Sequence, residues 1–292
     1  MPKCRGASLK QKPFKHVNVE GIRDDKLYTV PDFLLIGPQR TGTTWLSRYL
    51  VQHPEIFIPA EKELYYFNYL AKGAGKLFHS TRLSWYMSKF QPSMMDFLRL
   101  NAMNLKMMGR LPKESLQWFQ YNKAEIFGEA TASYAAMGEP LIEDVLRLNP
   151  NIKIIMLVRD PIERAWSHAK KDLLKANNKH MKDVPFSTFE DFYQRDYQIR
   201  CGQYREMIQL WKKHVSQERF LIKKFSDVTQ HPKPLFNDVC QFLGIQPMAE
   251  VLMKQQKVVN PTANVKLPAE HRALLSALFA DEIAYLQGKG WL

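Results

Sequence analysis

Long apolar runs in both halves of the chain predict strands of a buried sheet. The run Phe33–Ile36 contains no polar residue, and the run over 152–158 has a single lysine among its aliphatic side chains. Such runs are too unbroken for a strand with one face in water and are typical of a parallel sheet covered on both faces. Two further strands are expected at 125–128 and 219–225.

Apolar side chains at helical spacing fill the intervals between these strands. One such segment, 43–52, follows the first strand directly, and His53 with the proline after it ends the pattern. We interpret His53 as a helix-ending or packing residue rather than a catalytic histidine. Further helices are expected at 139–148, 204–214, 235–243 and 269–286. Strands that alternate with helices predict a three-layer α/β/α fold with a central parallel sheet, whose ligand lies beyond the strand C-termini.

The segment after the second long strand begins with the signals of a helix start. Asp160 suits the N-cap, Pro161 suits the first helical position, and Glu163 completes a capping box with a proline start. An aspartate after an apolar strand is also where ATPases hold magnesium. The capping role already accounts for Asp160, so we assign no metal site to it.

A flexible basic arm over residues 1–30 and one domain over 31–292 are the expected organisation. The first 30 residues are polar and basic without clear periodicity, and the remainder shows no internal repeat and no second core. A chain of 292 residues with 45% apolar residues can fill a sizeable single core. It contains neither an apolar leader nor a run approaching a membrane span, so a cytoplasmic location is expected.

The net charge indicates the kinds of partner that the chain can bind, and the cysteines indicate its compartment. With 42 Lys+Arg against 29 Asp+Glu, the formal charge of +13 favours anionic partners, such as nucleic acid, anionic lipid, polyanionic sugars or nucleotide phosphates. The three cysteines, Cys4, Cys201 and Cys240, lie far apart and in no metal-ligand spacing. This spacing argues against a disulfide framework or zinc site and indicates a reducing compartment.

The loop GPQRTGTTW over 37–45, between the first strand and its helix, has the composition of a phosphate-binding turn. Gly37 and Gly42 have the spacing of an ATP-binding loop, but Thr43 occupies the position of its lysine. Losing this lysine argues against metal-assisted phosphoryl transfer. What remains is a helix N-terminus with the Arg40 guanidinium and threonine hydroxyls, which would bind a phosphate without a metal. The hydroxyls belong to Thr41, Thr43 and Thr44.

The segment after the second long strand is a candidate phosphate site because of the family resemblance described in the next paragraph. The segment RDPIERAWS places Arg159 at the strand end and Ser167 eight residues later. A phosphate monoester suits a planar guanidinium and a hydroxyl donor. Either residue alone is more simply explained as a surface arginine or as a serine bonded to its own helical turn. The two loops together favour binding.

These two segments resemble the signatures of sulfotransferases that use 3′-phosphoadenosine 5′-phosphosulfate (PAPS). PQRTGTTWL resembles their 5′-phosphosulfate loop, and RDPIERAWS resembles their 3′-phosphate signature. The resemblance runs from about Asp32 to the C-terminus and includes GQYREMIQLWKKH, RFLIKKFSDV and FNDVCQFLGI. It implies a P-loop NTPase-like fold, PAPS as cofactor, 3′-phosphoadenosine 5′-phosphate (PAP) as product, and no metal. The implied cofactor-binding residues are Arg40, Thr41, Gly42, Thr43, Thr44, Trp45, Arg159 and Ser167. Trp45 has the position of an adenine-stacking tryptophan, although a core role is equally consistent with its place on the helix.

The resemblance also implies a catalytic base. The segment AEKELYYFN over 60–68 is similar to the E-x-x-[FY]-F-[DN] stretch of Golgi-type carbohydrate and related bacterial sulfotransferases, in which the Glu is the base. Glu63 takes that position, and Glu61 is its near competitor. Arg40 would stabilise charge on the departing oxygen.

The chain departs from this pattern at three places. Arg40 stands where many members carry lysine, and it cannot give up a proton to the departing oxygen. Ala130 stands where the sugar sulfotransferases carry a lysine. Their basic K-G-R loop is absent, and Lys257 or Lys266 is the candidate replacement.

The best reading is a sulfotransferase that acts on a hydroxyl or amine of a glycan or small molecule. The charge is compatible with a sulfated or carboxylated acceptor. Residues 70–120 match no family motif and are expected to form a helical lid or acceptor wall. The alternatives are a P-loop kinase or NTPase, which Thr43 disfavours, and a non-catalytic polyanion-binding protein, which only the net charge and the basic arm support. Nucleic acid is not expected, because no basic-aromatic stripe or recognition helix is found.

Overall fold

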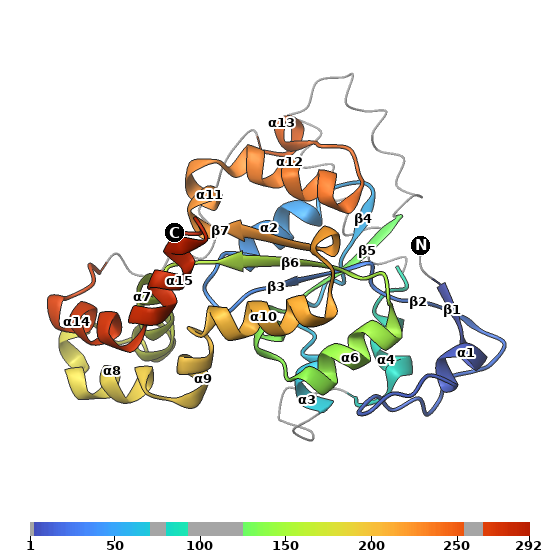
Figure 1. The fold of residues 1–292 in the computed structure, drawn as a ribbon, viewed down its shortest axis with the longest axis horizontal. Coiled ribbons are helices and arrows are strands. Elements are labelled where there is room, and N and C mark those ends of the chain that lie inside the picture. The colour runs from blue at the N-terminus through green and yellow to red at the C-terminus, as the bar shows by residue number, and fades with distance from the viewer. Residues whose placement is uncertain (1–2, 71–79, 93–124, 254–264) are drawn as a thin grey trace.

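A five-stranded parallel sheet forms the centre of the molecule (Figure 1). The structure is a computed structural model, in which residues 3–70, 80–92, 125–253 and 265–292 are described. The strand order is β4-β5-β3-β6-β7, and every neighbouring pair is parallel. The parallel sheet predicted from the apolar runs is thereby confirmed. The strands are β3 (Phe33–Ile36), β4 (Ile56–Phe57), β5 (Ile126–Ala130), β6 (Lys153–Val158) and β7 (Phe220–Lys224).

Helices cover both faces of this sheet, so the molecule has the three predicted layers. Leu34 and Ile154 enter one apolar cluster and Leu35 and Ile155 another, because successive strand side chains point to opposite faces. The first cluster is covered by α6 and α10 and the second by α2 and α12, as Figure 1 shows on the two sides of the sheet. These helices are α2 (Thr43–Leu50), α6 (Glu139–Leu148), α10 (Tyr204–His214) and α12 (Pro232–Leu243).

The topology brings the loops after β3 and β6 together. β3 lies between β5 and β6, so the loops that follow these three strands leave from one edge of the sheet. Gly37 begins the loop after β3 with a φ of 146°, and a Cβ atom there would lie 2.7 Å from the backbone oxygen of Leu157 on β6. Glycine therefore allows the loop to pass close against β6. Open sheets bind ligands at this kind of position.

Most predicted helices match the structure closely, and the main difference lies near the C-terminus. α6 and α10 have the predicted bounds, whereas α12 begins earlier, at Pro232. The single helix expected over 269–286 is two helices, α14 (Ala269–Leu278) and α15 (Ala280–Gly288). Phe279 separates them, and its side chain is buried. A Cβ atom added to Gly202 would lie 2.2 Å from the Phe279 ring. Packing against a distant residue, which no local pattern shows, therefore accompanies the break.

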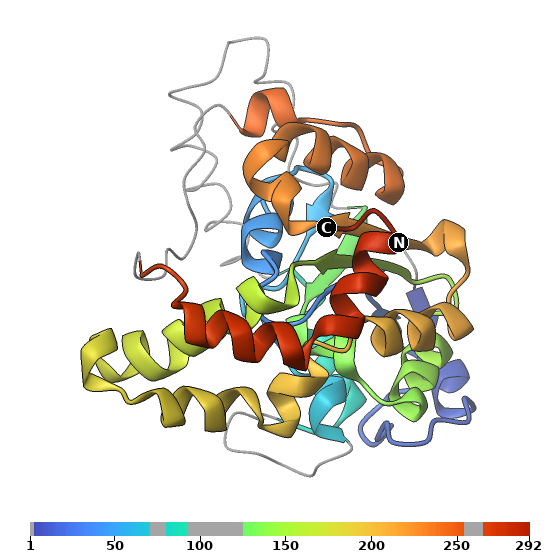
Figure 2. The same ribbon diagram turned by 60° about the vertical axis from the view of Figure 1, so that its left-hand side comes forward.

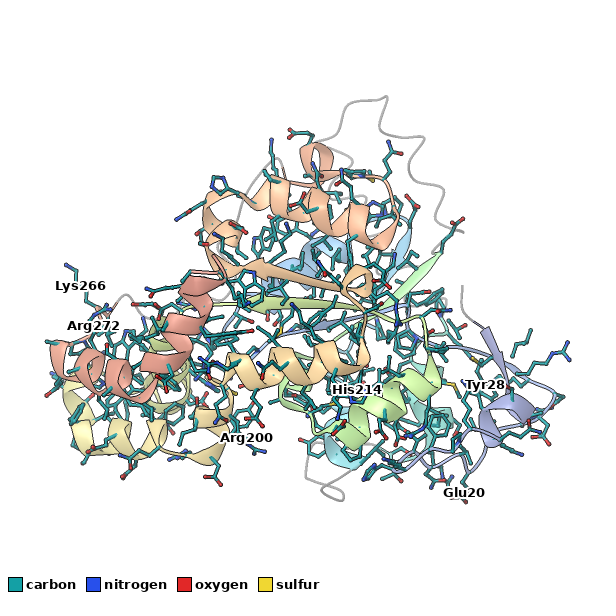
Figure 3. The ribbon with its side chains drawn as sticks, in the orientation of Figure 1. Glu20, Tyr28, Arg200, His214, Lys266 and Arg272 are labelled. Carbon is teal, nitrogen blue, oxygen red and sulfur yellow. The ribbon has the colours of Figure 1, made fainter. Side chains whose placement is uncertain are left out.

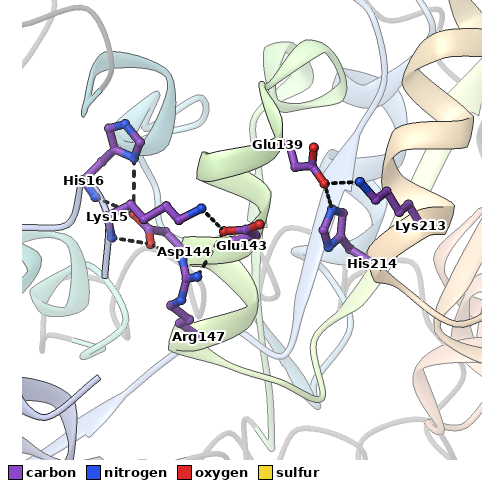
Figure 4. A network of polar contacts seen from close by, with 8 residues as sticks. All are labelled: Lys15, His16, Glu139, Glu143, Asp144, Arg147, Lys213 and His214. Carbon is purple, nitrogen blue, oxygen red and sulfur yellow. Dashed lines mark hydrogen bonds and ion pairs between the residues drawn. The ribbon is translucent and has the colours of Figure 1, made fainter. Parts of the chain in front are cut away.

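The prediction of a flexible arm over residues 1–30 is wrong for residues 3–30. This segment contains β1 (Lys3–Arg5), α1 (Gly6–Lys10) and β2 (Leu27–Thr29), with β1 and β2 paired antiparallel. Figure 4 shows how it is held on α6: the backbone N–H groups of Lys15 and His16 donate to the Asp144 carboxylate at 2.8 and 2.7 Å. The sequence conceals this because the buried side chains have no regular spacing. They are Leu9, Val17, Ile22, Tyr28 and Val30.

A third apolar cluster lies beside the chain segment that follows β6. It is formed by α7, α8 and α14, and Figures 1 and 2 show red α14 beside the yellow helices. Arg200, Lys266 and Arg272, which Figure 3 labels, lie at this end. The helices not yet given are α3 (Tyr66–Leu70), α4 (Leu83–Ser88), α7 (Pro161–Ala169), α8 (Phe186–Tyr193), α9 (Asp196–Arg200), α11 (Phe225–Gln230) and α13 (Ala249–Leu252).

Two expectations fall largely outside the described residues. The expected lid or acceptor wall over 70–120 lies mainly in 71–79 and 93–124, and Lys257 lies in 254–264. In the part of the chain that the structure describes, every helix is too short or too polar to cross a bilayer.

Candidate functional site

The loop after β3 presents a helix N-terminus at the C-terminal edge of the sheet. α2 begins at Thr43, and Gly42 before it adopts a left-handed φ of 96°. Arg40 is also left-handed, with a φ of 78°, a conformation that is uncommon for a residue with a side chain. The first N–H groups of a helix have no intrahelical acceptor and carry the positive end of the helix dipole. A helix start of this kind is suited to an anion.

The three threonines of this turn have different surroundings. The Thr41 hydroxyl is buried and donates to the Pro38 carbonyl at 2.9 Å, so it holds the loop in shape. Thr43 is also buried, at 4% exposure. Thr44 is partly exposed, and its hydroxyl accepts a hydrogen bond from Lys62 at 3.1 Å. Of the three hydroxyls, that of Thr44 is the one already engaged with a cation.

The two predicted signature segments meet in the structure. Arg40 Nε donates to Ser167 Oγ at 3.0 Å, across 127 residues of sequence. Arg159 Nη1 donates to the Arg40 carbonyl at 2.9 Å, and its guanidinium lies 4.1 Å from the ring centroid of Phe225, the first residue of α11. The same ring lies 3.0 Å from where a Cβ atom on Gly42 would be. The structure thus brings four of the residues chosen from the sequence into one site.

This part of the site is strongly and unusually positive. Burial lowers the pKa of both Arg40 and Arg159, although an arginine so shifted remains charged. Arg164 on α7 is fully buried, and its one hydrogen bond among the described residues is to the Gln198 carbonyl at 3.3 Å. Its Nε and Nη1 atoms, and Nε of Arg159, have no partner. Within the described ranges, none of these three guanidiniums has an ion pair with a carboxylate. An anionic ligand would therefore stabilise this group of positive charges.

Sequence reasoning missed Arg164. The RDPIERAWS segment contains it between the two chosen residues, but an arginine on a helix is normally exposed. The signal that could have found it is its helical spacing, since Arg164 lies three residues before Ser167 and so on the same helix face.

The acidic residues of this segment are engaged elsewhere. Asp160 accepts from the N–H groups of Ile162 and Glu163 at 2.8 and 3.0 Å, which confirms its predicted role as the N-cap of α7. The Glu163 carboxylate instead contacts Arg272 at 3.3 Å. Because Asp160 is committed to capping, it does not support the magnesium site that a kinase would need.

Lys62 and Glu63 lie together on the other side of the loop after β3. Glu63 is left-handed, with a φ of 66°, and its N–H donates to the Ala130 carbonyl at the end of β5 at 3.1 Å. Lys62 Nζ lies 2.8 Å from Glu63 Oε1. The other carboxylate oxygen, Oε2, is buried and has no hydrogen-bond partner. An unpartnered buried carboxylate oxygen is a suitable acceptor for a substrate proton.

The residues after Glu63 anchor the segment that carries it. Tyr66 and Phe67 are buried, with exposed fractions of 0% and 1%, and Asn68 accepts a hydrogen bond from Ser133 at 2.6 Å. Burial, and then the charge of the nearby Glu63, raises the pKa of the Tyr65 phenol. The competitor Glu61 is exposed and pairs with Lys89 at 2.8 Å.

A second carboxyl group lies buried behind Glu63. Glu129 near the end of β5 is 1% exposed and accepts hydrogen bonds from Tyr86 and from Thr131, the latter at 2.7 Å. Burial raises its pKa to about 7, and the Glu63 charge contributes in the same direction. The sequence identified this residue only as the neighbour of Ala130. Its burial depends on contacts with distant segments, which no local motif records.

Trp45 and His53 have clear packing roles. Trp45 is 7% exposed and packs in the cluster between α2 and α12, with its ring centroid 4.9 Å from that of Tyr49. Little of the ring is left for adenine, so stacking remains a prediction. His53 is 2% exposed; its Nδ1 accepts from Glu55 N–H at 3.2 Å, and its Nε2 contacts the Gln246 carbonyl at 2.9 Å. This agrees with the interpretation of His53 as a packing residue.

Lys266 and a group of possible metal ligands lie apart from these contacts. Lys266, the described candidate for the missing basic loop, is exposed before α14. Among the described residues, one group has metal-ligand spacing, namely Glu139, Glu143 and His214. Figure 4 shows that both of its carboxylates are paired with lysine or arginine, and it lies on α6 and α10 rather than on the loops after β3 and β6.

Known proteins resemble this chain over most of its length. A family model described as Sulfotransferase family matches residues 31–250. The chain is 31% identical over 173 residues to membrane-associated sulfotransferase kil1 of Dictyostelium discoideum, covering 58% of this chain and 28% of the relative. It is 26% identical over 287 residues to carbohydrate sulfotransferase 15 of Mus musculus, covering 85% and 49%. It is 27% identical over 241 residues to bifunctional heparan sulfate N-deacetylase/N-sulfotransferase 4 of Mus musculus, covering 75% and 23%. The chain therefore spans about half or less of the length of these relatives.

Solved structures show the same fold. A sulfotransferase from Alicyclobacillus acidocaldarius superposes with a TM-score of 0.58 at 21% identity, covering 89% of this chain and 95% of that one. A sulfotransferase domain from the curacin biosynthetic pathway gives a TM-score of 0.50 at 14% identity, covering 86% and 98%. The predicted three-layer fold of the P-loop type is confirmed by this likeness.

Proposed function

The chain belongs to the sulfotransferase family, and we propose that it transfers a sulfuryl group from PAPS to a hydroxyl or amine of an acceptor. The observation that carries this proposal is the contact between the two nucleotide-binding signatures, made by Arg40 Nε and Ser167 Oγ at 3.0 Å. A single nucleotide with a phosphate at each end would engage both.

The residues present fit such a nucleotide. The N–H groups at the start of α2, with Gly42, Thr43 and Thr44, would hold the 5′-phosphosulfate. Arg159 and Ser167 would hold the 3′-phosphate, and Arg40, which is hydrogen-bonded to Ser167, adds positive charge beside it. The unpartnered nitrogens of Arg159 and Arg164 support a binding role for this cluster, because buried cations without counterions favour a bound anion. Thr41 shapes the loop, and Trp45 packs behind it.

Glu63 is the proposed base. PAPS would supply the sulfuryl group that is transferred. Glu63 Oε2 accepts the proton of the acceptor hydroxyl or amine, and the left-handed backbone at Glu63, bonded to Ala130, orients the carboxylate. Glu61, exposed and paired with Lys89, lacks these supports.

The acceptor is proposed to be a glycan or a small molecule. Relatives named as carbohydrate and heparan sulfate sulfotransferases support the glycan, and the net charge of +13 is compatible with an acidic one. The three cysteines are free thiols, which agrees with the proposed cytoplasmic, reducing compartment.

Transfer from radiolabelled PAPS to a panel of glycans, phenols, alcohols and amines tests the proposal. We expect label transfer that persists in EDTA, together with a rise in the unfolding temperature on addition of PAP. Transfer that is lost in EDTA and returns with magnesium would favour a kinase-like enzyme. Absence of any PAP-induced shift would favour the non-catalytic polyanion-binding protein.

A further inference from the structure

The ammonium group that the loop after β3 lacks is supplied by another segment. In an ATP-binding loop of this spacing a lysine would stand at Thr43. Here Lys62 Nζ reaches the same helix N-terminus, 3.1 Å from the hydroxyl of the adjacent Thr44. Lys62 lies 18 residues beyond Thr44, on the segment that also carries Glu63. One ammonium thus contacts both the phosphate-binding turn and the proposed base, at 2.8 Å from Glu63 Oε1.

Arg40 is directed away from this point. Its guanidinium is hydrogen-bonded to Ser167 on α7, and its carbonyl is bonded by Arg159. Both partners belong to the segment after β6, where the 3′-phosphate is expected. Arg40 therefore lies with the cations of the 3′ end, while the cation beside the helix start and Glu63 is Lys62.

We propose that Lys62 is a catalytic residue of sulfuryl transfer, which stabilises the departing 5′-phosphate, and that Arg40 serves the 3′-phosphate. This inference rests on the proposed function. It assigns the reaction to an ammonium and a carboxylate on one short segment, Lys62 and Glu63. The binding role goes to the guanidiniums of Arg40 and Arg159.

The step balances without a metal or an oxidant. The acceptor oxygen or nitrogen forms a bond to sulfur, and the bond between sulfur and the bridging oxygen of the 5′-phosphate breaks. The electron pair of that bond remains on the 5′-phosphate of PAP, and the acceptor proton passes to Glu63. Lys62 stays protonated and donates a hydrogen bond to the oxygen on which charge develops.

Two variants and three nucleotides distinguish the role of Lys62 from that of Arg40. Lys62→Met and Arg40→Met would be compared with the unaltered protein for the release of PAP from PAPS. Binding of PAPS, PAP and adenosine 5′-phosphosulfate, which lacks the 3′-phosphate, would be measured by calorimetry. For Lys62→Met we expect turnover to fall about 10²–10³-fold, as on loss of one charge-stabilising donor. We also expect the substitution to reduce the affinity for PAP more than the affinity for PAPS, because PAP carries the extra negative charge on its 5′-phosphate.

The preference for nucleotides with a 3′-phosphate should instead depend on Arg40 and not on Lys62. Lys62→Met should keep the ratio of PAPS to adenosine 5′-phosphosulfate affinities within about twofold of the unaltered protein. Arg40→Met should reduce that ratio about tenfold or more, as on loss of a hydrogen bond to a charged group. Lys62→Arg, which keeps the charge, should recover part of the lost turnover. Lys89→Met, which removes a partly exposed lysine paired with Glu61, is the matched control and should change neither quantity.

The outcomes distinguish this inference from the proposed function. If Lys62→Met retains turnover within about threefold while Arg40→Met loses it at saturating PAPS, the assignment of Lys62 is wrong and the sulfotransferase proposal stands. Loss of the 3′-phosphate preference in Lys62→Met would also overturn the assignment. If the unaltered protein neither binds PAP nor releases it from PAPS, the proposed function itself fails, and the role of Lys62 fails with it.

Discussion

The two ends of the site are constructed differently. At the end formed by the segment after β6, the fully buried Arg164 and the partly buried Arg40 and Arg159 gather with no carboxylate paired to them among the described residues. At the end formed by Lys62 and Glu63, opposite charges are paired and partly exposed, with side-chain exposures of 26% and 18%. The first end is suited to holding a fixed anion. The second end is suited to chemistry, because its groups can exchange partners as protons and charge move.

This difference has an energetic basis. Burying a charge without a partner destabilises a protein, and binding of an anion to the folded state offsets that cost. Lys62 and Glu63 are already paired with each other, so nucleotide binding offsets no comparable cost at the second end. Substitutions at the first end should therefore act on nucleotide affinity and stability, whereas those at the second should act on turnover.

The largest effect is expected from Glu63→Gln. Glutamine keeps the size of the side chain but cannot accept a proton, so turnover should fall about 10²–10⁴-fold, the usual contribution of a general base. PAP affinity should remain within about threefold, because the carboxylate does not hold the nucleotide. Steady-state kinetics and calorimetry with PAP check both values. Glu61→Gln is the control, and an equal loss of turnover in that variant would contradict the choice of base.

A smaller but opposite effect is expected from Arg159→Met. Loss of a guanidinium that binds a phosphate should weaken PAP binding about 10–100-fold, as for other hydrogen bonds to charged groups. Turnover at saturating PAPS should change little. Arg272→Met, which removes an exposed arginine labelled in Figure 3, is the control and should leave PAP affinity unchanged. If Arg159→Met reduced turnover at saturating PAPS while preserving PAP affinity, the division between the two ends would be wrong.

The sequence predicts the frame of this site better than its charges. Unbroken apolar runs, a glycine turn and an N-cap are local signals, so the positions of β3, β6, the loop and Asp160 could all be read from neighbouring residues. The pairing of the two signatures also follows, because adjacent parallel strands end at one edge of the sheet.

What could not be read is which charged residues are buried and which of them meet. Arg164 and Glu129 resemble ordinary surface residues in the sequence, and their burial is set by α9 and α4, which are distant along the chain. The sequence also gives no sign that Lys62 belongs to the site, because its contact with Thr44 depends on the path of the intervening chain. The packed N-terminal segment was missed for the same reason, since its buried residues are spaced irregularly and find partners on α6.

Arg164→Met sharpens the description of the binding end. Replacing a buried, incompletely bonded arginine with an apolar side chain of similar length should raise the unfolding temperature of the nucleotide-free protein by about 2 °C. The same change should weaken PAP binding about threefold or more, since a positive charge is lost near the 3′ end. Differential scanning fluorimetry with and without PAP measures both. A lower unfolding temperature without nucleotide would instead make Arg164 a structural support, and Arg164→Lys would show whether charge alone restores affinity.

The smallest effect concerns Glu129, the carboxyl group behind the reactive end. Burial raises its pKa from 4.5 to about 7, so between these values the folded state retains a proton that the unfolded state has lost. The stabilisation is complete below pH 4.5 and is lost as the pH rises through about 7. Glu129→Gln cannot titrate, and its unfolding temperature should fall less between pH 5 and pH 8, by about 2 °C, than that of the unaltered protein. Asp32, whose pKa burial raises to about 6, should keep a part of the slope in both proteins. An identical slope in the variant would mean that Glu129 is already ionised at pH 5, held by Tyr86 and Thr131 as a fixed anion behind Glu63.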